Sequence, residues 1–188
     1  MTNSLLISPL LLEEQCLDVV ATEELEYISR FSSASRRKES LTWRAVLGRA
    51  LGRKIRVVYD ENGAPSIAGS NLYIGVSHTK DMVAVTLSTK PCAVDIERKD
   101  RNFSRAAAKF LTEEEQKLAV SNTALAAIWC AKECYYKFSR NPQLDMLKGI
   151  RVVELDLEQG RVTVEDNQSE KATMKILDRD DHIIVYIL

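Results

Sequence analysis

The chain has 188 residues, of which 26 are Lys or Arg and 27 are Asp or Glu, so its formal charge is −1 at pH 7. With 45% hydrophobic and 28% charged residues it has the composition of a folded domain, which excludes a disordered chain, a collagen-like repeat and a polybasic nucleic-acid tail. Its apolar start lacks a basic region, and no apolar run approaches the ~20 residues of a membrane helix. We therefore expect a cytoplasmic protein with no membrane partner.

Acidic and basic residues are segregated near the start of the chain. Residues 1–29 hold six acids and no Lys or Arg, whereas residues 30–56 hold nine bases and one acid, Glu39, a local charge of +8. Each base alone is usually one charge on a solvated helix face, but a stretch this dense attracts phosphates or an acidic partner. The chain has no recognisable nucleic-acid-binding motif and a near-neutral total charge, so we expect no nucleic-acid partner.

The first half of the chain alternates helical periodicity with short apolar runs and turn residues. Helix caps and a closing glycine mark the ends of its longer helix. The expected elements are a strand over 3–12 with a turn at Pro9, a helix over 21–30 capped by Thr22, a helix over 36–51 capped by Ser33 or Ser35 and ended by Gly52, strands over 55–59, 72–77 and 82–88, and a turn over 60–65.

The second half has the same kinds of signal, with one strong helix and a terminal set of strands. The expected elements are a strand over 93–97, a short helix whose capping box is Thr112 with Glu115, a helix over 122–140, and strands over 151–157, 161–164, 172–177 and 183–188. A faint echo relates residues 77–85 to residues 180–186, since each closes its half with a turn and a strand. We therefore expect two related α+β halves, residues 1–90 and 91–188. The four cysteines are expected to be buried thiols.

The segment AVDIE places two acids, Asp95 and Glu97, on the same face of a strand, because side chains alternate. Neighbouring carboxylates repel unless a cation lies between them, and hard oxygen ligands suit Mg²⁺. On the strong helix, Glu133 and Lys137 are four residues apart and share a face. This pair is either a surface ion pair or an acid of the same metal site beside a lysine.

A third motif, Gly75-Val76-Ser77-His78-Thr79, follows an apolar strand. Hydroxyl and imidazole donors at a strand end are suited to phosphate oxygens. Ser77 and His78 are adjacent on a strand and therefore face apart, so they do not form a hydrolase dyad.

These motifs follow one another in the order GAPSI, GVSHTKDMVAVTLS, AVDIE, FLTEEE and WCAKECYYK. In this order they resemble the 4′-phosphopantetheinyl transferase superfamily, most closely its Sfp-like branch, strongly over residues 63–137 and more loosely outside. The resemblance implies an α+β fold of two pseudo-symmetric halves, each a helix packed on a small antiparallel sheet, with the active site in the cleft between them. Residues 1–90 would carry the basic helix and the Ser-His motif, and residues 91–188 the AVDIE strand, the WCAKECYYK helix and the terminal strands.

The resemblance also implies an enzyme, a holo-carrier-protein synthase. Such an enzyme moves 4′-phosphopantetheine from coenzyme A to a serine of an acidic, helical apo acyl or peptidyl carrier protein. The reaction requires Mg²⁺ and releases 3′,5′-ADP. Two halves in one chain favour a monomer.

By resemblance, individual residues take roles in this reaction. Asp95, Glu97 and Glu133 match the Mg²⁺ ligands, and Ala93 stands where the family has a glycine. Lys137 matches a lysine near the transferring phosphate. The candidate catalytic residues are Glu133, Lys137 and Glu115, with Glu133 or Glu115 taking the serine proton. The residues expected to bind coenzyme A are Arg36, Arg37, Lys38, Arg44, Gly63, Pro65, Ser77, His78 and Lys137.

Two other classes of function use the same residues. One is a Mg²⁺-dependent phosphohydrolase or nuclease, in which an activated water replaces the carrier serine. The other is a catalytically inactive module that binds coenzyme A or a carrier protein. The presence of all three acids argues against the inactive module.

Overall fold

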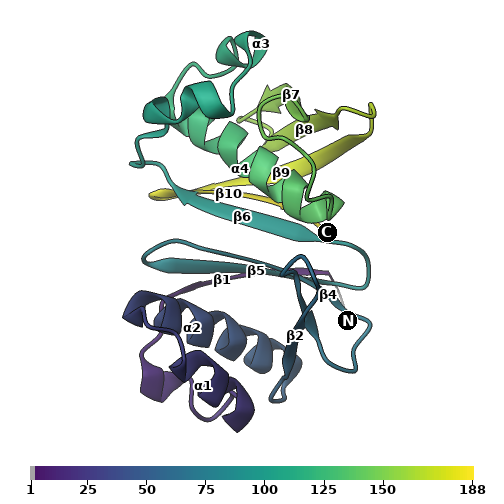
Figure 1. Cartoon of the computed structure of the whole chain (residues 1–188). Coiled ribbons are helices and arrows are strands. Elements are labelled where there is room, and N and C mark those ends of the chain that lie inside the picture. Colours follow the sequence, from purple (N-terminus) through teal and green to yellow (C-terminus); the bar gives the residue numbers. More distant parts are fainter. Residues whose placement is uncertain (1–2) are drawn as a thin grey trace. The chain divides into compact units, whose positions relative to one another are not determined.

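The computed structural model describes residues 3–188 and divides the chain into two compact units. One unit runs up to Cys92 and includes Leu188, and the other is Ala93–Ile187. Each unit combines helices with antiparallel strands (Figure 1), which confirms the expected α+β class. Among the described residues, no helix is both long and apolar enough to cross a membrane.

In the first unit, one long helix packs against a three-stranded sheet in the order β1-β5-β4, beside a two-stranded hairpin. Trp43 and Leu47 of the helix bury their side chains against Val83 and Val85 of the central strand. The elements are β1 (Ser4–Pro9), a 3₁₀ helix (Glu13–Gln15), α1 (Thr22–Ser29), α2 (Ala34–Leu51), β2 (Val57–Tyr59), β3 (Pro65–Ile67), β4 (Tyr73–His78) and β5 (Met82–Ser88).

In the second unit, the helix α4 crosses a five-stranded antiparallel sheet in the order β6-β10-β9-β8-β7 (Figure 1). Ile128 and Cys134 of α4 are fully buried in a core that includes Ile183 and Val185. The elements are β6 (Ala93–Arg98), 3₁₀ helices (Phe103–Arg105 and Ala107–Lys109), α3 (Glu113–Gln116), α4 (Asn122–Ser139), β7 (Ile150–Asp156), β8 (Arg161–Asp166), β9 (Lys171–Arg179) and β10 (His182–Ile187).

The two units share a chain order. In each, the first strand pairs with the last strand, β1 with β5 and β6 with β10, and the last strand also pairs with the one before it. A short helix and then a long helix follow the first strand, and two further strands come next. The echo in the sequence therefore falls on equivalent turns, β4–β5 and β9–β10.

The structure decides one open choice between two helix caps and corrects three other local expectations. The cap of α2 is Ser33, whose hydroxyl accepts from the amide of Arg36 at 3.3 Å. Thr22 is the first residue of α1 and not its cap. The strand β2 begins at Val57, and Pro65 opens a short strand and does not lie in the turn, because proline is tolerated at the start of a strand. All four cysteines are buried and free, as expected.

A buried ion pair ties the helices of the first unit to its hairpin. Arg44 of α2 is fully buried, and its Nε lies 2.6 Å from Oε2 of Glu24 on α1. The other oxygen of Glu24 accepts from the amide of Val57 in β2 at 2.8 Å. One carboxylate therefore joins three elements.

The second unit has a buried pair at the same place in the chain order. Lys132 of α4 lies 2.8 Å from Glu115 of α3, and the amide of Val152 in β7 donates to Glu115 at 2.7 Å. Both side chains are almost completely inaccessible, at 0% and 1% exposure. The arrangement of acid on the short helix, base on the long helix and amide on the next strand thus occurs in both units.

Ser33→Ala is expected to lower the free energy of unfolding by about 1 kcal/mol, because it removes the side-chain oxygen that accepts from the first turn of α2. Urea unfolding measures the change. The control is Ser32→Ala, one residue earlier, which removes an exposed hydroxyl that does not cap the helix. Equal losses in both variants would contradict the capping role.

Candidate functional site

Two carboxylates of β6 point at the helix α4. Ala93 belongs to the core beneath α4, so Asp95 and Glu97, which alternate with it, share that face of the strand. Oδ1 of Asp95 accepts from Nζ of Lys137 at 2.6 Å. Oε1 of Glu97 accepts from the indole Nε1 of Trp129 at 2.9 Å. The structure thus confirms the shared face predicted from the alternation of the strand.

Three residues of α4 line the side that meets these acids. Trp129, Glu133 and Lys137 follow one another at intervals of four residues and so form one row on the helix. The outer two contact β6 directly, and Glu133 lies between them. The structure therefore places the three acids that the sequence analysis selected near enough for their charges to interact, with Lys137 beside Asp95.

The acids repel one another in this arrangement. Burial raises the pKa of Glu97 to about 7, and the charges of Asp95 and Glu133 add to the rise, against the lowering effects of Arg101 and of the Trp129 hydrogen bond. Burial and then the charge of Asp95 also raise the pKa of Glu133 above its usual range. The cluster therefore has more negative charge than its surroundings balance.

Two protein cations partly offset this charge. Burial alone would lower the pKa of Lys137, but the charge and hydrogen bond of Asp95 outweigh it and hold the pKa above the usual range, so this lysine is protonated at neutral pH. Arg101, four residues after Glu97, forms an ion pair with it and packs over the ring of Trp129. The sequence analysis missed Arg101, although its spacing from Glu97 was visible.

A divalent cation is suited to this donor set. Within residues 3–188, no three His, Cys, Asp or Glu side chains are gathered closely enough to hold a metal ion, so the predicted three-ligand centre is not confirmed. The chemistry nevertheless fits Mg²⁺, because the cluster offers hard carboxylate oxygens, and burial together with the neighbouring acids raises the pKa values of two of them.

The raised pKa of Glu97 predicts a pH-dependent stability. The folded protein keeps this proton up to about pH 7, whereas the unfolded chain releases it near the ordinary value of 4.5. Its contribution is therefore full below pH 4.5 and is lost as pH rises through 7, by up to about 3 kcal/mol. Urea unfolding from pH 5 to 8 with EDTA is expected to show Glu97→Gln gaining stability over the wild type as pH rises.

The matched control is Glu158→Gln, which neutralises an exposed acid in the turn between β7 and β8. It should follow the wild-type profile. A constant difference between Glu97→Gln and the wild type across this range would show that Glu97 does not titrate there.

Glu115 has a different role from the one expected. It is 1% exposed, pairs with Lys132, and accepts from the amides of Thr112 at 2.8 Å and Val152 at 2.7 Å. Its oxygens are therefore occupied by structural contacts inside the second unit. This burial points to a structural role for Glu115, and the assignment of the serine proton to Glu133 or Glu115 stays a prediction.

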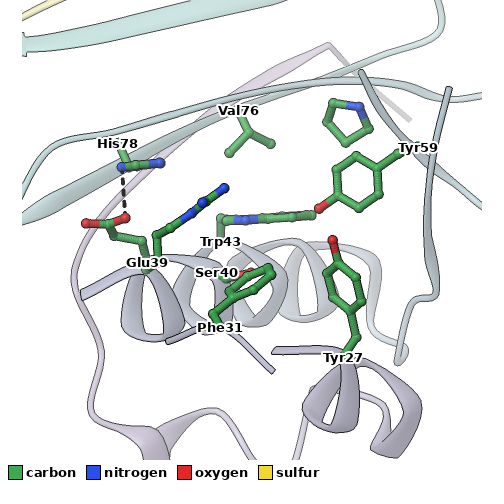
Figure 2. A pocket seen from close by; sticks show the side chains of 10 residues that line it. Tyr27, Phe31, Glu39, Ser40, Trp43, Tyr59, Val76 and His78 are labelled. Atoms are coloured by element: carbon green, nitrogen blue, oxygen red, sulfur yellow. Dashed lines mark ion pairs between the residues drawn. The ribbon is translucent and has the colours of Figure 1, made fainter. Parts of the chain in front are cut away.

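The first unit contains a pocket of about 260 Å³ between α1, α2, β4 and the hairpin (Figure 2). Four aromatic side chains form much of its lining, with charged and polar groups at one end. The lining residues are Tyr27, Phe31, Arg36, Glu39, Ser40, Trp43, Tyr59, Pro65, Val76 and His78. Aromatic faces beside a cationic group suit a planar ring that carries phosphate.

The four basic residues expected to bind coenzyme A differ in their position relative to the pocket. Arg36 lines the pocket, with its guanidinium 5.3 Å from the centre of the Phe31 ring. Arg37 donates to the carbonyl of Phe31 at 2.5 Å, outside the pocket lining. Lys38 is exposed and also outside the lining.

Arg44, which was expected to bind coenzyme A, does not line the pocket. Its side chain is fully buried in the pair with Glu24, so its charge is not available to a ligand. It lies instead behind the pocket, where it stacks 4.1 Å from the centre of the Trp43 ring and donates to the hydroxyl of Tyr59 at 3.1 Å. Arg44 therefore supports both of these aromatic walls.

The other residues expected to bind coenzyme A, in β4 and near the hairpin, also differ in whether they line the pocket. Val76 and His78 lie on the face of the strand that lines the pocket, and Ser77, between them, faces the opposite side and is 8% exposed. Pro65 lines the pocket, whereas Gly63, with φ of +80°, forms the preceding turn and is not in the lining. The expectation that Ser77 and His78 act on the same ligand is thus not supported within this pocket.

Sequence reasoning missed most of the pocket. Tyr27, Phe31, Trp43 and Tyr59 come from three separate segments, and only the fold gathers them. Glu39 was visible as the one acid among nine bases, but its partners were not.

A comparison with models of protein families gives a match over the second unit. The sequence model of the 4′-phosphopantetheinyl transferase superfamily matches residues 91–187, which is just over half of the 188-residue chain. The matched range covers the second unit and includes all three acids and Lys137. Comparison with curated proteins finds no match.

Proposed function

This chain belongs to the 4′-phosphopantetheinyl transferase superfamily, and we propose that it transfers 4′-phosphopantetheine from coenzyme A to a serine of an apo carrier protein. Membership indicates phosphopantetheine transfer in general. The observation that supports the specific reaction is the gathering of Asp95, Glu97 and Glu133 beside Lys137, on the strand and helix that the family match covers.

Mg²⁺ would be held by the carboxylates of Asp95, Glu97 and Glu133. When bound, it would neutralise negative charge on the pyrophosphate as the bond between the two phosphates breaks. Lys137, protonated through its pairing with Asp95, adds a further positive charge to the same oxygens.

The transfer itself is a displacement at phosphorus. The hydroxyl oxygen of the carrier serine bonds to the phosphate that bears pantetheine, the bond from that phosphate to the second phosphate breaks, and 3′,5′-ADP leaves with the electron pair. Glu133 takes the serine proton. Its raised pKa suits this role, because a carboxylate with a higher pKa is a stronger base.

The pocket of the first unit is assigned to the nucleotide part of coenzyme A. Tyr27, Trp43 and Tyr59 offer aromatic faces for the adenine ring, and Arg36 with His78 offer charge and a donor for phosphate. The remaining bases of residues 30–56, such as the exposed Lys38, are proposed to attract an acidic carrier protein.

Mass spectrometry tests the reaction. The purified protein is incubated with coenzyme A, Mg²⁺ and an apo carrier protein, and the carrier is then weighed intact and after digestion. A gain of one phosphopantetheine on a serine, with equimolar 3′,5′-ADP, supports the proposal. Hydrolysis of coenzyme A without carrier modification would select a phosphohydrolase, and binding without any product would select an inactive module.

A further inference from the structure

One carboxylate stands at the phosphate-binding end of the pocket of the first unit. Nδ1 of His78 lies 3.3 Å from Oε2 of Glu39, and the two side chains face each other across the pocket end (Figure 2). Oε1 of Glu39 accepts from the hydroxyl of Ser35, one helical turn earlier, at 2.7 Å. The side chain of Glu39 is 11% exposed, and that of His78 is 46% exposed.

An acid in this place needs an explanation. Glu39 is the one acid among nine bases in residues 30–56, and it lines the same pocket as Arg36. A carboxylate beside a phosphate site repels the ligand unless another group interacts with the carboxylate and offsets its charge. His78, in contact with Glu39, is suited to be that group.

The contact favours one state of the imidazole ring. A carboxylate oxygen only accepts, so the approach of Oε2 to 3.3 Å favours a proton on Nδ1 of His78. Nε2 is then the ring nitrogen presented to a ligand, and it becomes a donor when the ring is cationic. Because Ser35 and burial hold Glu39 in place, the ring is oriented before a ligand arrives.

We propose that Glu39 is a positioning residue, which orients the His78 ring toward a phosphate group of the ligand. The charged groups that line the pocket beside the ring are Glu39 and Arg36. The inference rests on the proposed function in one respect, namely that the phosphate belongs to coenzyme A.

The first test reads the ring itself. The chain has two histidines, so ¹⁵N-histidine labelling gives one pair of imidazole signals for each, with His182, in β10 of the other unit, as internal control. At a pH where His78 is neutral, the wild type is expected to have its ring proton on Nδ1. Glu39→Ala is expected to shift His78 toward the Nε2-protonated form that imidazole prefers in water, with His182 unchanged.

The second test reads ligand affinity by calorimetry with coenzyme A and with 3′,5′-ADP. Glu39→Ala is expected to weaken binding about tenfold, as expected for the loss of a charge-assisted hydrogen bond. Adding His78→Ala to Glu39→Ala should cost no more than His78→Ala alone, because the two residues act through one ring. Glu23→Gln, an exposed acid on α1, is the control and should bind like the wild type.

Glu39→Gln guards against misfolding of the alanine variant. It retains the shape and one acceptor oxygen, so the Nδ1 proton should stay while affinity falls by a smaller factor. The positioning role is overturned if coenzyme A binds, His78→Ala weakens it, and both Glu39 variants leave affinity and the His78 signals unchanged. Failure of the wild type to bind coenzyme A would overturn the ligand assignment together with the proposed function, and the imidazole signals alone would then report whether Glu39 holds the ring.

Discussion

Asp95→Asn and Glu133→Gln are each expected to reduce phosphopantetheine transfer by about a thousandfold or more. Each variant keeps the size of the side chain but removes one negative charge from the cluster between β6 and α4, which would weaken binding of the cation that neutralises the breaking pyrophosphate. Glu133→Gln also removes the proposed acceptor of the serine proton. Single-turnover assays at saturating Mg²⁺, with intact mass of the carrier protein as readout, measure the loss.

Urea unfolding distinguishes a loss of activity at the site from a loss caused by misfolding. Because burial and Asp95 raise the pKa of Glu133, its charge opposes folding at neutral pH, so Glu133→Gln is expected to unfold at an equal or higher urea concentration than the wild type. Glu158→Gln, in the exposed turn between β7 and β8, should leave transfer and stability unchanged. Wild-type turnover in either cluster variant would remove that acid from the proposed site.

Lys132→Met is expected to lower the free energy of unfolding by about 3–5 kcal/mol. The substitution leaves the carboxylate of Glu115 buried at 1% exposure without its cation, and an uncompensated buried charge is among the costliest single changes. It also removes the hydrogen bonds from Nζ to the carbonyls of Phe110 at 2.6 Å and Met146 at 3.0 Å. Urea unfolding at pH 7 measures the change.

Two further variants test whether the loss of stability comes from the unpaired charge of Glu115. Lys132→Met with Glu115→Gln should recover part of the loss, since no charge is then left buried and the one amide oxygen of Gln still accepts from the amide of Thr112 or of Val152. Lys137→Met, on the same helix, leaves Asp95 at 7% exposure without its cation, but the 32% exposure of the Lys137 side chain lets water reach that carboxylate. We therefore expect a smaller loss of stability than for Lys132→Met, together with the loss of most of the activity. Similar stability losses for Lys132→Met and Lys137→Met would refute the distinction between the two lysines.

Much of the fold follows from local signals in the sequence. The alternation in AVDIE and the interval between Glu133 and Lys137 are set by strand and helix geometry, and both survive in the structure. The capping box of Thr112 and Glu115 is likewise confirmed. These features depend on residues within one turn or one strand of each other.

The roles of Arg44 and Glu115 could not be predicted in the same way. Both lie in or next to segments that match the family motifs. Arg44, however, is paired with a residue 20 positions away and Glu115 with one 17 positions away, and the elements that bury them cannot be located from the sequence. A charged residue exposed to ligand and one buried in an ion pair look alike in a sequence. Distance along the chain is also why the four aromatic walls of the pocket went unrecognised.

The buried guanidinium of Arg44 couples recognition to the integrity of the first unit. The same group that anchors α1 and the hairpin also backs the rings of Trp43 and Tyr59. The guanidinium also lies 5.6 Å from the centre of the Tyr27 ring. Natural variation in ligand preference should therefore accumulate at Phe31, which packs edge to face on Tyr27 at 5.3 Å but is not held by that anchor. Selection has more freedom at Phe31 than at the three aromatic walls that Arg44 supports.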